Sequence, residues 1–225
     1  MSISIAENKF ILGDCVEFMK TIPDKHFDLT LTDPPYGVGL EYEDYSDTKE
    51  NLEKLLIEFI PELIRISKFA LITPGCSNLN SWHSFDYMFM IHQPASGEIS
   101  KYGMNTFQPI LVYGSEVLNG LKNRWTVIQN TETSPKNSHP CPKPLKLWEK
   151  ILLRGSANEG DLVFDPFLGS GTTAIVCHNQ NRSFVGCELS KKYYDLSVER
   201  FKDHISQERL FVPQKEIIKD IELFE

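Results

Sequence analysis

The sequence predicts an α/β protein with a doubly wound, mostly parallel sheet. Short apolar runs of strand length alternate with helical patterns along the 225 residues. Two of these runs are each followed by a proline- or glycine-rich loop, at residues 32–37 and 165–173. Because open α/β sheets bind ligands at the carboxyl ends of their parallel strands, both loops are expected at one edge of the sheet.

Seven runs have the composition of strands, so we expect a seven-stranded sheet. They are residues 10–12, 28–32, 69–73, 87–91, 109–113, 162–165 and 183–188. Residues 51–67 carry leucine, isoleucine and phenylalanine at helical spacing, and Pro61 is expected to kink or divide that helix. Further helices are predicted at residues 144–153, 172–180 and 191–207. Residues 93–108 and 114–143 show no clear pattern, and the tail from residue 210 fits either a short helix or a frayed end.

Composition favours one globular domain over residues 1–225, because 41% of the residues are apolar. No apolar run is long enough to span a membrane, and no signal peptide is visible. The five scattered cysteines form no Cys-x-x-Cys pair, which predicts reduced thiols, a cytoplasmic location and no metal site. The net charge of −8 argues mildly against nucleic acid, but basic residues collect between residues 115 and 155.

The glycine-rich loop predicts a cofactor site. Gly169 and Gly171 allow a tight turn at a strand end, and no lysine follows them as it would in a phosphate-binding P-loop. Glu188 ends the next strand, where an acid is positioned for ribose hydroxyls. A nucleoside cofactor without a phosphate cradle, such as S-adenosylmethionine, fits this pattern better than a plain strand–turn–helix. The residues predicted to bind it here are Asp165, Phe167, Gly169, Ser170, Gly171, Thr172, Thr173 and Glu188.

The tetrad Asp33-Pro34-Pro35-Tyr36 predicts chemistry on a base amine. The two prolines remove amide donors and leave the Asp33 carboxylate and the Pro34 carbonyl as acceptors. If these acceptors take both hydrogens of an exocyclic amine, the nitrogen lone pair becomes available to attack a sulfonium methyl group. Tyr36 offers a flat face on which an extruded base can stack. The alternative interpretation is a proline-stiffened turn with a surface tyrosine.

These motifs, in this order, resemble the amino-methyltransferases of DNA that act on adenine N6 or cytosine N4, over roughly residues 10–205. The catalytic motif precedes the cofactor loop, as in the circularly permuted β group. The resemblance implies a Rossmann-like, class I S-adenosylmethionine-dependent fold with the late strands beside the early ones. It also implies that Asp14 and Cys15 contact the cofactor adenine, and that residues 139–144 border its methionine end. The implied cofactor residues are therefore also Asp14, Cys15, Asp33, His139 and Lys143.

The segment that carries target recognition in this family is short here, at about residues 114–138. That length suggests a short recognition site, weak specificity or help from a second subunit, so a homodimer sharing double-stranded DNA is one expectation. The predicted DNA contacts are Lys122, Arg124, Trp125 and Lys136.

The aspartate at the head of the tetrad favours adenine N6 as the acceptor. The resemblance implies restriction-modification chemistry at the nucleoid, and the sequence leaves open whether a restriction enzyme is the partner. Three alternatives stay open: a cytosine N4 methyltransferase, a catalytically silent DNA-binding relative, and an enzyme that methylates RNA or a protein amide. An intact tetrad argues against the silent relative, and aspartate rather than asparagine before the prolines argues against the protein-directed enzymes.

Overall fold

The computed structural model describes residues 8–40, 42, 44–93, 99–100, 103–114, 126–130, 132, 143–156 and 158–211. Within these residues the main sheet has eight strands in the order β1-β10-β9-β2-β3-β7-β4-β8. Their bounds are β1 Lys9–Leu12, β2 Leu29–Thr32, β3 Ala70–Ile72, β4 Tyr87–His92, β7 Phe107–Tyr113, β8 Val127–Gln129, β9 Leu162–Asp165 and β10 Ser183–Glu188.

The sheet is mostly parallel. Strands β1, β10, β9, β2 and β3 all run parallel, β7 is antiparallel to both β3 and β4, and β8 is parallel to β4. The late strands β9 and β10 lie between the early strands β1 and β2, as the permuted arrangement requires. All seven predicted strands are present, but the predicted total of seven is wrong by one. The extra strand, β8, has three residues at the sheet edge, too few for a periodic signal.

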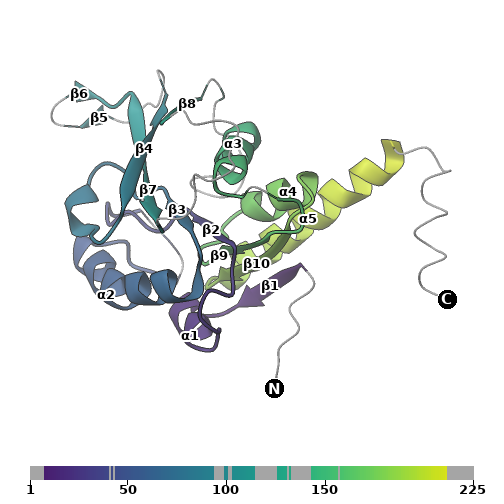
Figure 1. The fold of residues 1–225 in the computed structure, drawn as a ribbon, viewed down its shortest axis with the longest axis horizontal. Helices are drawn as coiled ribbons and strands as arrows, with labels where there is room; N and C mark the ends of the chain where they lie inside the picture. Colours follow the sequence, from purple (N-terminus) through teal and green to yellow (C-terminus); the bar gives the residue numbers. More distant parts are fainter. Residues whose placement is uncertain are drawn as a thin grey trace.

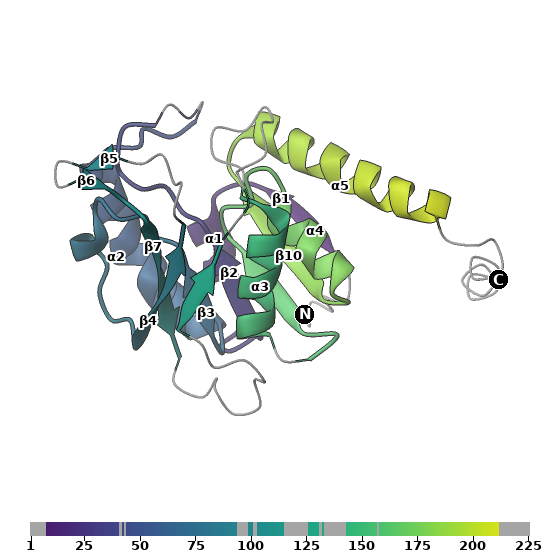
Figure 2. The same ribbon diagram turned by 90° about the horizontal axis from the view of Figure 1, so that it is seen from above.

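Helices cover both faces of the sheet (Figures 1 and 2). One face carries α1 (Cys15–Lys20) and α2 (Lys49–Ile66). The other carries α3 (Leu145–Gly155), α4 (Thr172–Asn179) and α5 (Lys191–Phe211). A short 3₁₀ turn, η1 (Leu79–Ser81), and a small hairpin of β5 (Ile99–Ser100) and β6 (Gly103–Met104) complete the described elements. The architecture is therefore the predicted three-layer α/β fold.

Helix α2 corrects one expectation, because it runs unbroken through Pro61. The helix begins where the Thr48 hydroxyl accepts the amide of Asn51 at 3.2 Å. Pro61 and Ile57, whose carbonyl would have received the missing bond, both lie on the exposed face of the helix. Water can therefore replace the lost hydrogen bond, and the packed face holds the helix together. That face buries Leu52, Leu56, Phe59, Ile60, Leu63 and Ile66.

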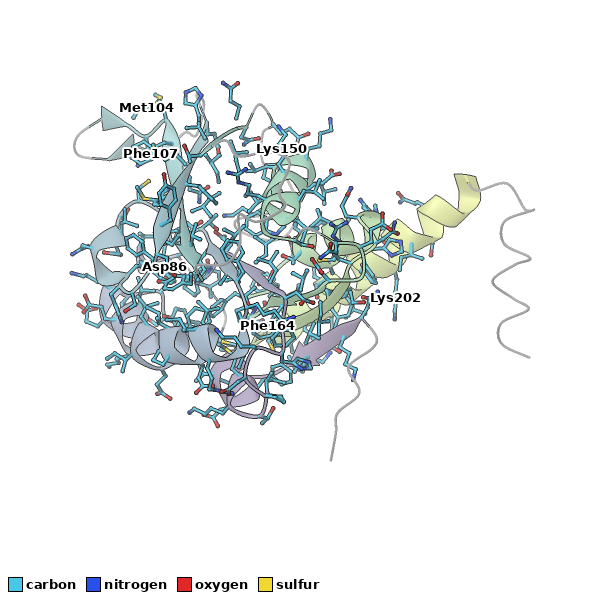
Figure 3. All side chains as sticks on the ribbon, viewed as in Figure 1. Asp86, Met104, Phe107, Lys150, Phe164 and Lys202 are labelled. Atoms are coloured by element: carbon cyan, nitrogen blue, oxygen red, sulfur yellow. The ribbon has the colours of Figure 1, made fainter. Side chains whose placement is uncertain are left out.

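The core lies in the two layers between sheet and helices. Phe164 on β9 is fully buried and stacks on Phe27 with ring centroids 4.6 Å apart. Met104 and Phe107, by contrast, lie exposed at the rim of the sheet near β6 and β7 (Figure 3). The interior is thus filled by side chains, which leaves the strand ends as the place for a site.

Candidate active site

A pocket opens at the carboxyl ends of β1, β2, β9 and β10, where the two predicted loops meet. Most of the predicted cofactor residues line it: Asp14, Cys15, Asp33, Lys143, Asp165, Phe167, Gly169, Ser170, Thr172, Thr173 and Glu188. Pro35 of the tetrad also lines the pocket. Residues far apart in the chain therefore share one concave site, as the strand order demands.

The glycine-rich loop makes the tight turn that its sequence predicts. Gly169 and Gly171 have positive φ angles of 52° and 76°. A Cβ on Gly171 would lie 3.0 Å from the Cβ of Ser197, so this glycine lets α5 pack against the loop. Gly171 thus shapes the loop from behind and is not among the residues lining the pocket. Arg200 on α5, which sequence reasoning missed, donates to the carbonyl of Ser170 at 2.7 Å.

Glu188 joins three strand ends. One carboxylate oxygen accepts the amide of Gly169 at 2.8 Å, and the other accepts the amide of Ser190 at 3.0 Å. Its own carbonyl accepts the amide of Gly13 at 2.9 Å. Burial raises the pKa of the Glu188 carboxyl, and the bonds from the backbone amides oppose that shift. A carboxylate has about four acceptor positions, so capacity remains for a ligand hydroxyl.

Asp165 is buried behind the loop and supports it. Its carboxylate accepts the Thr32 hydroxyl at 2.6 Å, the Phe167 amide at 3.1 Å and the Thr173 hydroxyl at 2.5 Å. Trp148 extends this chain by donating to the Thr173 hydroxyl at 2.8 Å. Burial raises the pKa of Asp165 to about 6, although its hydroxyl and amide donors pull the other way. Asp165, which the sequence predicted as a cofactor ligand, is thus already hydrogen-bonded to residues of β2 and α4.

The turn after β1 lines the same pocket. The Asp14 carboxylate accepts the amides of Val16 and Glu17 at 2.8 and 3.0 Å and so caps α1. Cys15 is 7% exposed, and burial raises the pKa of its thiol well above the usual range. The thiol is therefore a neutral, apolar part of the lining.

The catalytic tetrad forms a dense polar cluster beside the pocket. One Asp33 oxygen accepts the Tyr36 hydroxyl at 2.5 Å and also the Thr73 hydroxyl. The other Asp33 oxygen lies 2.5 Å from the Lys143 ammonium. Thr73 follows β3, next to β2 in the sheet, so the strand-end rule could have found it. Gln108, on the antiparallel β7, donates to the Tyr36 hydroxyl at 2.9 Å and gave no sequence signal.

The ring of Tyr36 is held in place by its surroundings. Gly75 packs against it so closely that a Cβ there would lie 3.0 to 3.2 Å from three ring atoms. Asn78 donates to the carbonyls of Tyr36 and Gly37 at 2.8 and 2.9 Å, which fixes the loop backbone. The ring is thus presented in one orientation, as a stacking platform requires.

The segment after the tetrad contributes residues that sequence reasoning did not select. Asp47 is 2% exposed and accepts the amides of Gly37, Val38 and Leu40, which folds the segment back on itself. Tyr45 in this segment and Ser190 after β10 both line the pocket. Within the described part of the chain, their buried hydroxyls have no hydrogen-bond partner. Buried polar groups of this kind are candidates for bonds to a ligand.

Several predicted residues fall outside the described ranges. They are His139 of the cofactor set and the predicted DNA contacts Lys122, Arg124, Trp125 and Lys136. Most of the predicted recognition segment at about 114–138 lies outside as well. Among the described residues, no cluster of histidine, cysteine, aspartate or glutamate could hold a metal ion, and no helix could cross a membrane.

Comparison with known proteins places the chain in one family. A family model described as DNA methylase matches residues 78–199. The chain is 28% identical to the type II methyltransferase M.HpaI of Haemophilus parainfluenzae, over 86% of this chain and 74% of that protein. It is 24% identical to the DNA adenine methyltransferase YhdJ of Escherichia coli (strain K12), over 89% and 85%.

Solved structures of similar fold agree with this match. The M1.HpyAVI–SAM complex superposes with a TM-score of 0.61 at 22% identity, covering 85% of this chain and 98% of that one. The cytosine-N4-specific PvuII DNA methyltransferase superposes with a TM-score of 0.63 at 15% identity, covering 90% and 94%. At these identities the superpositions support the fold only, and the assignment to the family rests on the family model.

Proposed function

The chain belongs to the DNA methylase family, and from that premise we propose that it transfers a methyl group from S-adenosylmethionine to adenine N6 in double-stranded DNA. One observation carries the proposal. The Asp33–Tyr36 cluster directly adjoins a pocket formed by the glycine-rich loop and Glu188. A donor held in that pocket and a base stacked at Tyr36 would meet beside the acceptors of the tetrad.

The pocket residues fit S-adenosylmethionine. The spare acceptor capacity of Glu188 suits the ribose hydroxyls, and the tight turn at Gly169 lets a ligand approach the backbone. Cys15 and Asp14 line the same pocket and, by the family resemblance, would contact the adenine ring. When bound, the cofactor would supply an electrophilic methyl group on a sulfonium sulfur.

The residues of the tetrad would position the target. Asp33 and the carbonyl of Pro34 would accept the two hydrogens of the exocyclic amine, so that its lone pair points into the pocket. Tyr36 would stack on the extruded base. The hydroxyls of Tyr36 and Thr73 donate to one oxygen of Asp33. The other oxygen, which would face the amine, lies 2.5 Å from the Lys143 ammonium. This chemistry relies on position and electrostatics rather than on a strong base.

The choice of adenine rests on the aspartate at position 33 and on the likeness to an adenine methyltransferase. The likeness in fold to a cytosine-N4-specific enzyme makes cytosine N4 the second candidate. A catalytically silent relative is disfavoured because the tetrad and the cofactor loop are intact.

The proposal extends to the rest of the chain. Residues 1–225 form a single methyltransferase domain in which the segment at about 114–138 reads the site and contacts phosphates through Lys122, Arg124 and Lys136. Trp125 reaches the bases. Because the recognition segment is short, two copies of the chain would bind the DNA together as a homodimer. Since the substrate is DNA, the enzyme would act at the nucleoid.

Mass spectrometry of the modified nucleosides tests this function. Purified protein would be incubated with unmethylated plasmid and S-adenosylmethionine, and the DNA digested to nucleosides. We expect N6-methyladenine, and we expect none from an Asp33→Ala variant that still binds cofactor. N4-methylcytosine would replace the adenine assignment by its alternative, and no methylated base on any of several unrelated plasmids would refute the function. Sequencing the product with modified-base detection gives the site.

A further inference from the structure

The ammonium of Lys143 lies where three features of the active site meet. It is 2.5 Å from the Asp33 carboxylate and 3.0 Å from the Tyr36 hydroxyl. It lies beyond the hydroxyl end of the Tyr36 ring, 5.4 Å from the ring centroid. The Lys143 and Asp33 side chains are only 11% and 18% exposed, so this is no loose surface pair.

The position of this ammonium is also the position that the reaction requires for the methyl-accepting amine. Asp33 and Lys143 line the cofactor pocket, whereas Tyr36 does not, and the Lys143 ammonium contacts both the Asp33 carboxylate and the Tyr36 hydroxyl. A methyl acceptor must come within about 3–3.5 Å of the carbon it attacks. On the proposed function it must also donate hydrogen to Asp33 and belong to a base stacked on Tyr36. These conditions point to one small volume.

An ammonium and an exocyclic amine can each donate to the same Asp33 oxygen. Lysine offers three N–H donors and no acceptor, and the target amine offers two N–H donors. We propose that Lys143 is a positioning residue whose ammonium fills the position of the target amine when no DNA is bound, holds Asp33 ready, and withdraws when the base enters. This inference rests on the proposed function and adds to it a residue that is displaced in each catalytic cycle.

In this position the Lys143 ammonium should affect the binding of S-adenosylmethionine and of S-adenosylhomocysteine differently. S-adenosylmethionine carries a sulfonium charge, and its product S-adenosylhomocysteine does not. An ammonium at the amine position stands close to that sulfonium and repels it, whereas the neutral thioether is unaffected. Lys143 should therefore weaken binding of S-adenosylmethionine relative to S-adenosylhomocysteine.

A second role for Lys143 predicts an unchanged ratio of the two dissociation constants. If its ammonium instead binds the cofactor's methionine carboxylate, it supports both molecules alike, because both carry that carboxylate. The ratio of the two dissociation constants separates these roles, and a merely structural role would not move it either.

Calorimetry with Lys143→Met tests the proposal without DNA. We expect the Kd of S-adenosylmethionine divided by that of S-adenosylhomocysteine to fall about tenfold or more relative to wild type. Lys143→Arg keeps the charge and should keep the ratio near the wild-type value. Lys146→Met removes the same charge from an exposed lysine on α3 and should also leave the ratio unchanged. An unchanged ratio in a folded Lys143→Met protein overturns the proposal, whether the binding of both ligands stays the same or weakens equally.

Fluorescence gives an independent readout of base entry. With 2-aminopurine at the target position of the mapped site and no cofactor present, Lys143→Met should raise the signal of the extruded base severalfold over wild type and over Lys146→Met. A signal equal to wild type overturns displacement by the base. If the wild type methylates DNA but Lys143→Met shows neither expected change, only the role of Lys143 is refuted. A wild type that binds S-adenosylmethionine and methylates no DNA refutes the proposed function instead.

Discussion

Replacing Glu188 by alanine should affect both cofactor binding and the loop that surrounds it. Glu188 accepts the amides of Gly169 and Ser190, and each such bond contributes about 0.5–1.5 kcal/mol net. The free energy of unfolding should therefore fall by about 1–3 kcal/mol. If the carboxylate also accepts a ribose hydroxyl, the variant loses a further charge-assisted bond of about 1.5–3 kcal/mol. That loss corresponds to a Kd for S-adenosylmethionine about 10- to 150-fold higher.

Calorimetry and urea unfolding of the same preparations separate these two effects. Arg200→Leu is the matched control, because it removes a support of the same loop at Ser170 from the α5 side and leaves the carboxylate in place. We expect Arg200→Leu to lose stability with only a small change in cofactor affinity. If both variants lose affinity in proportion to their loss of stability, the reasoning is refuted and Glu188 acts on the loop alone. Wild-type affinity in Glu188→Ala would refute it as well.

Further variants test other parts of the site. Gly171→Ala should destabilise the protein by about 1–3 kcal/mol in urea unfolding, more than Gly160→Ala, because both glycines have positive φ but only Gly171 packs against Ser197. Ser190→Ala should leave stability unchanged or higher and weaken S-adenosylmethionine binding in calorimetry; unaltered binding would remove this hydroxyl from the site. Since burial raises the pKa of Asp165 to about 6, its contribution to stability is present below about pH 4 and is lost as the pH rises through 6. Wild type should therefore lose stability relative to Asp165→Asn between pH 4.5 and 7 in urea unfolding, and a constant difference would count against that shift.

The strands and the pocket were predictable because their signals are local. The apolar residues in 28–32 and 162–165 have the spacing and length of buried strands, and a motif directly after each is expected at the strand end. Strand β8 was not predictable, because three residues at a sheet edge carry no period. Pro61 was expected to kink or divide α2. The division is wrong, because that local rule took no account of which face of α2 is exposed.

The bonds inside the site were beyond the reach of sequence reasoning. Glu188 was placed correctly at a strand end, but its hydrogen bond with the Gly169 amide depends on the register between β9 and β10. Arg200 looks like any basic residue of a surface helix until α5 is docked on the loop. Lys143 could be assigned to the pocket from its motif, whereas its pairing with Asp33 joins two segments more than a hundred residues apart.

The strand order also governs when the protein can work during its own synthesis. The catalytic tetrad follows β2 and leaves the ribosome early, but the neighbours of β1 and β2 on the cofactor side are β10 and β9, near the other end of the chain. Long-range pairing of this kind delays folding until both partners exist. A nascent chain that has reached only β8 carries Asp33 and Tyr36 but has no glycine loop and no Glu188. The order of the strands therefore keeps an incomplete chain from taking up cofactor or acting on DNA.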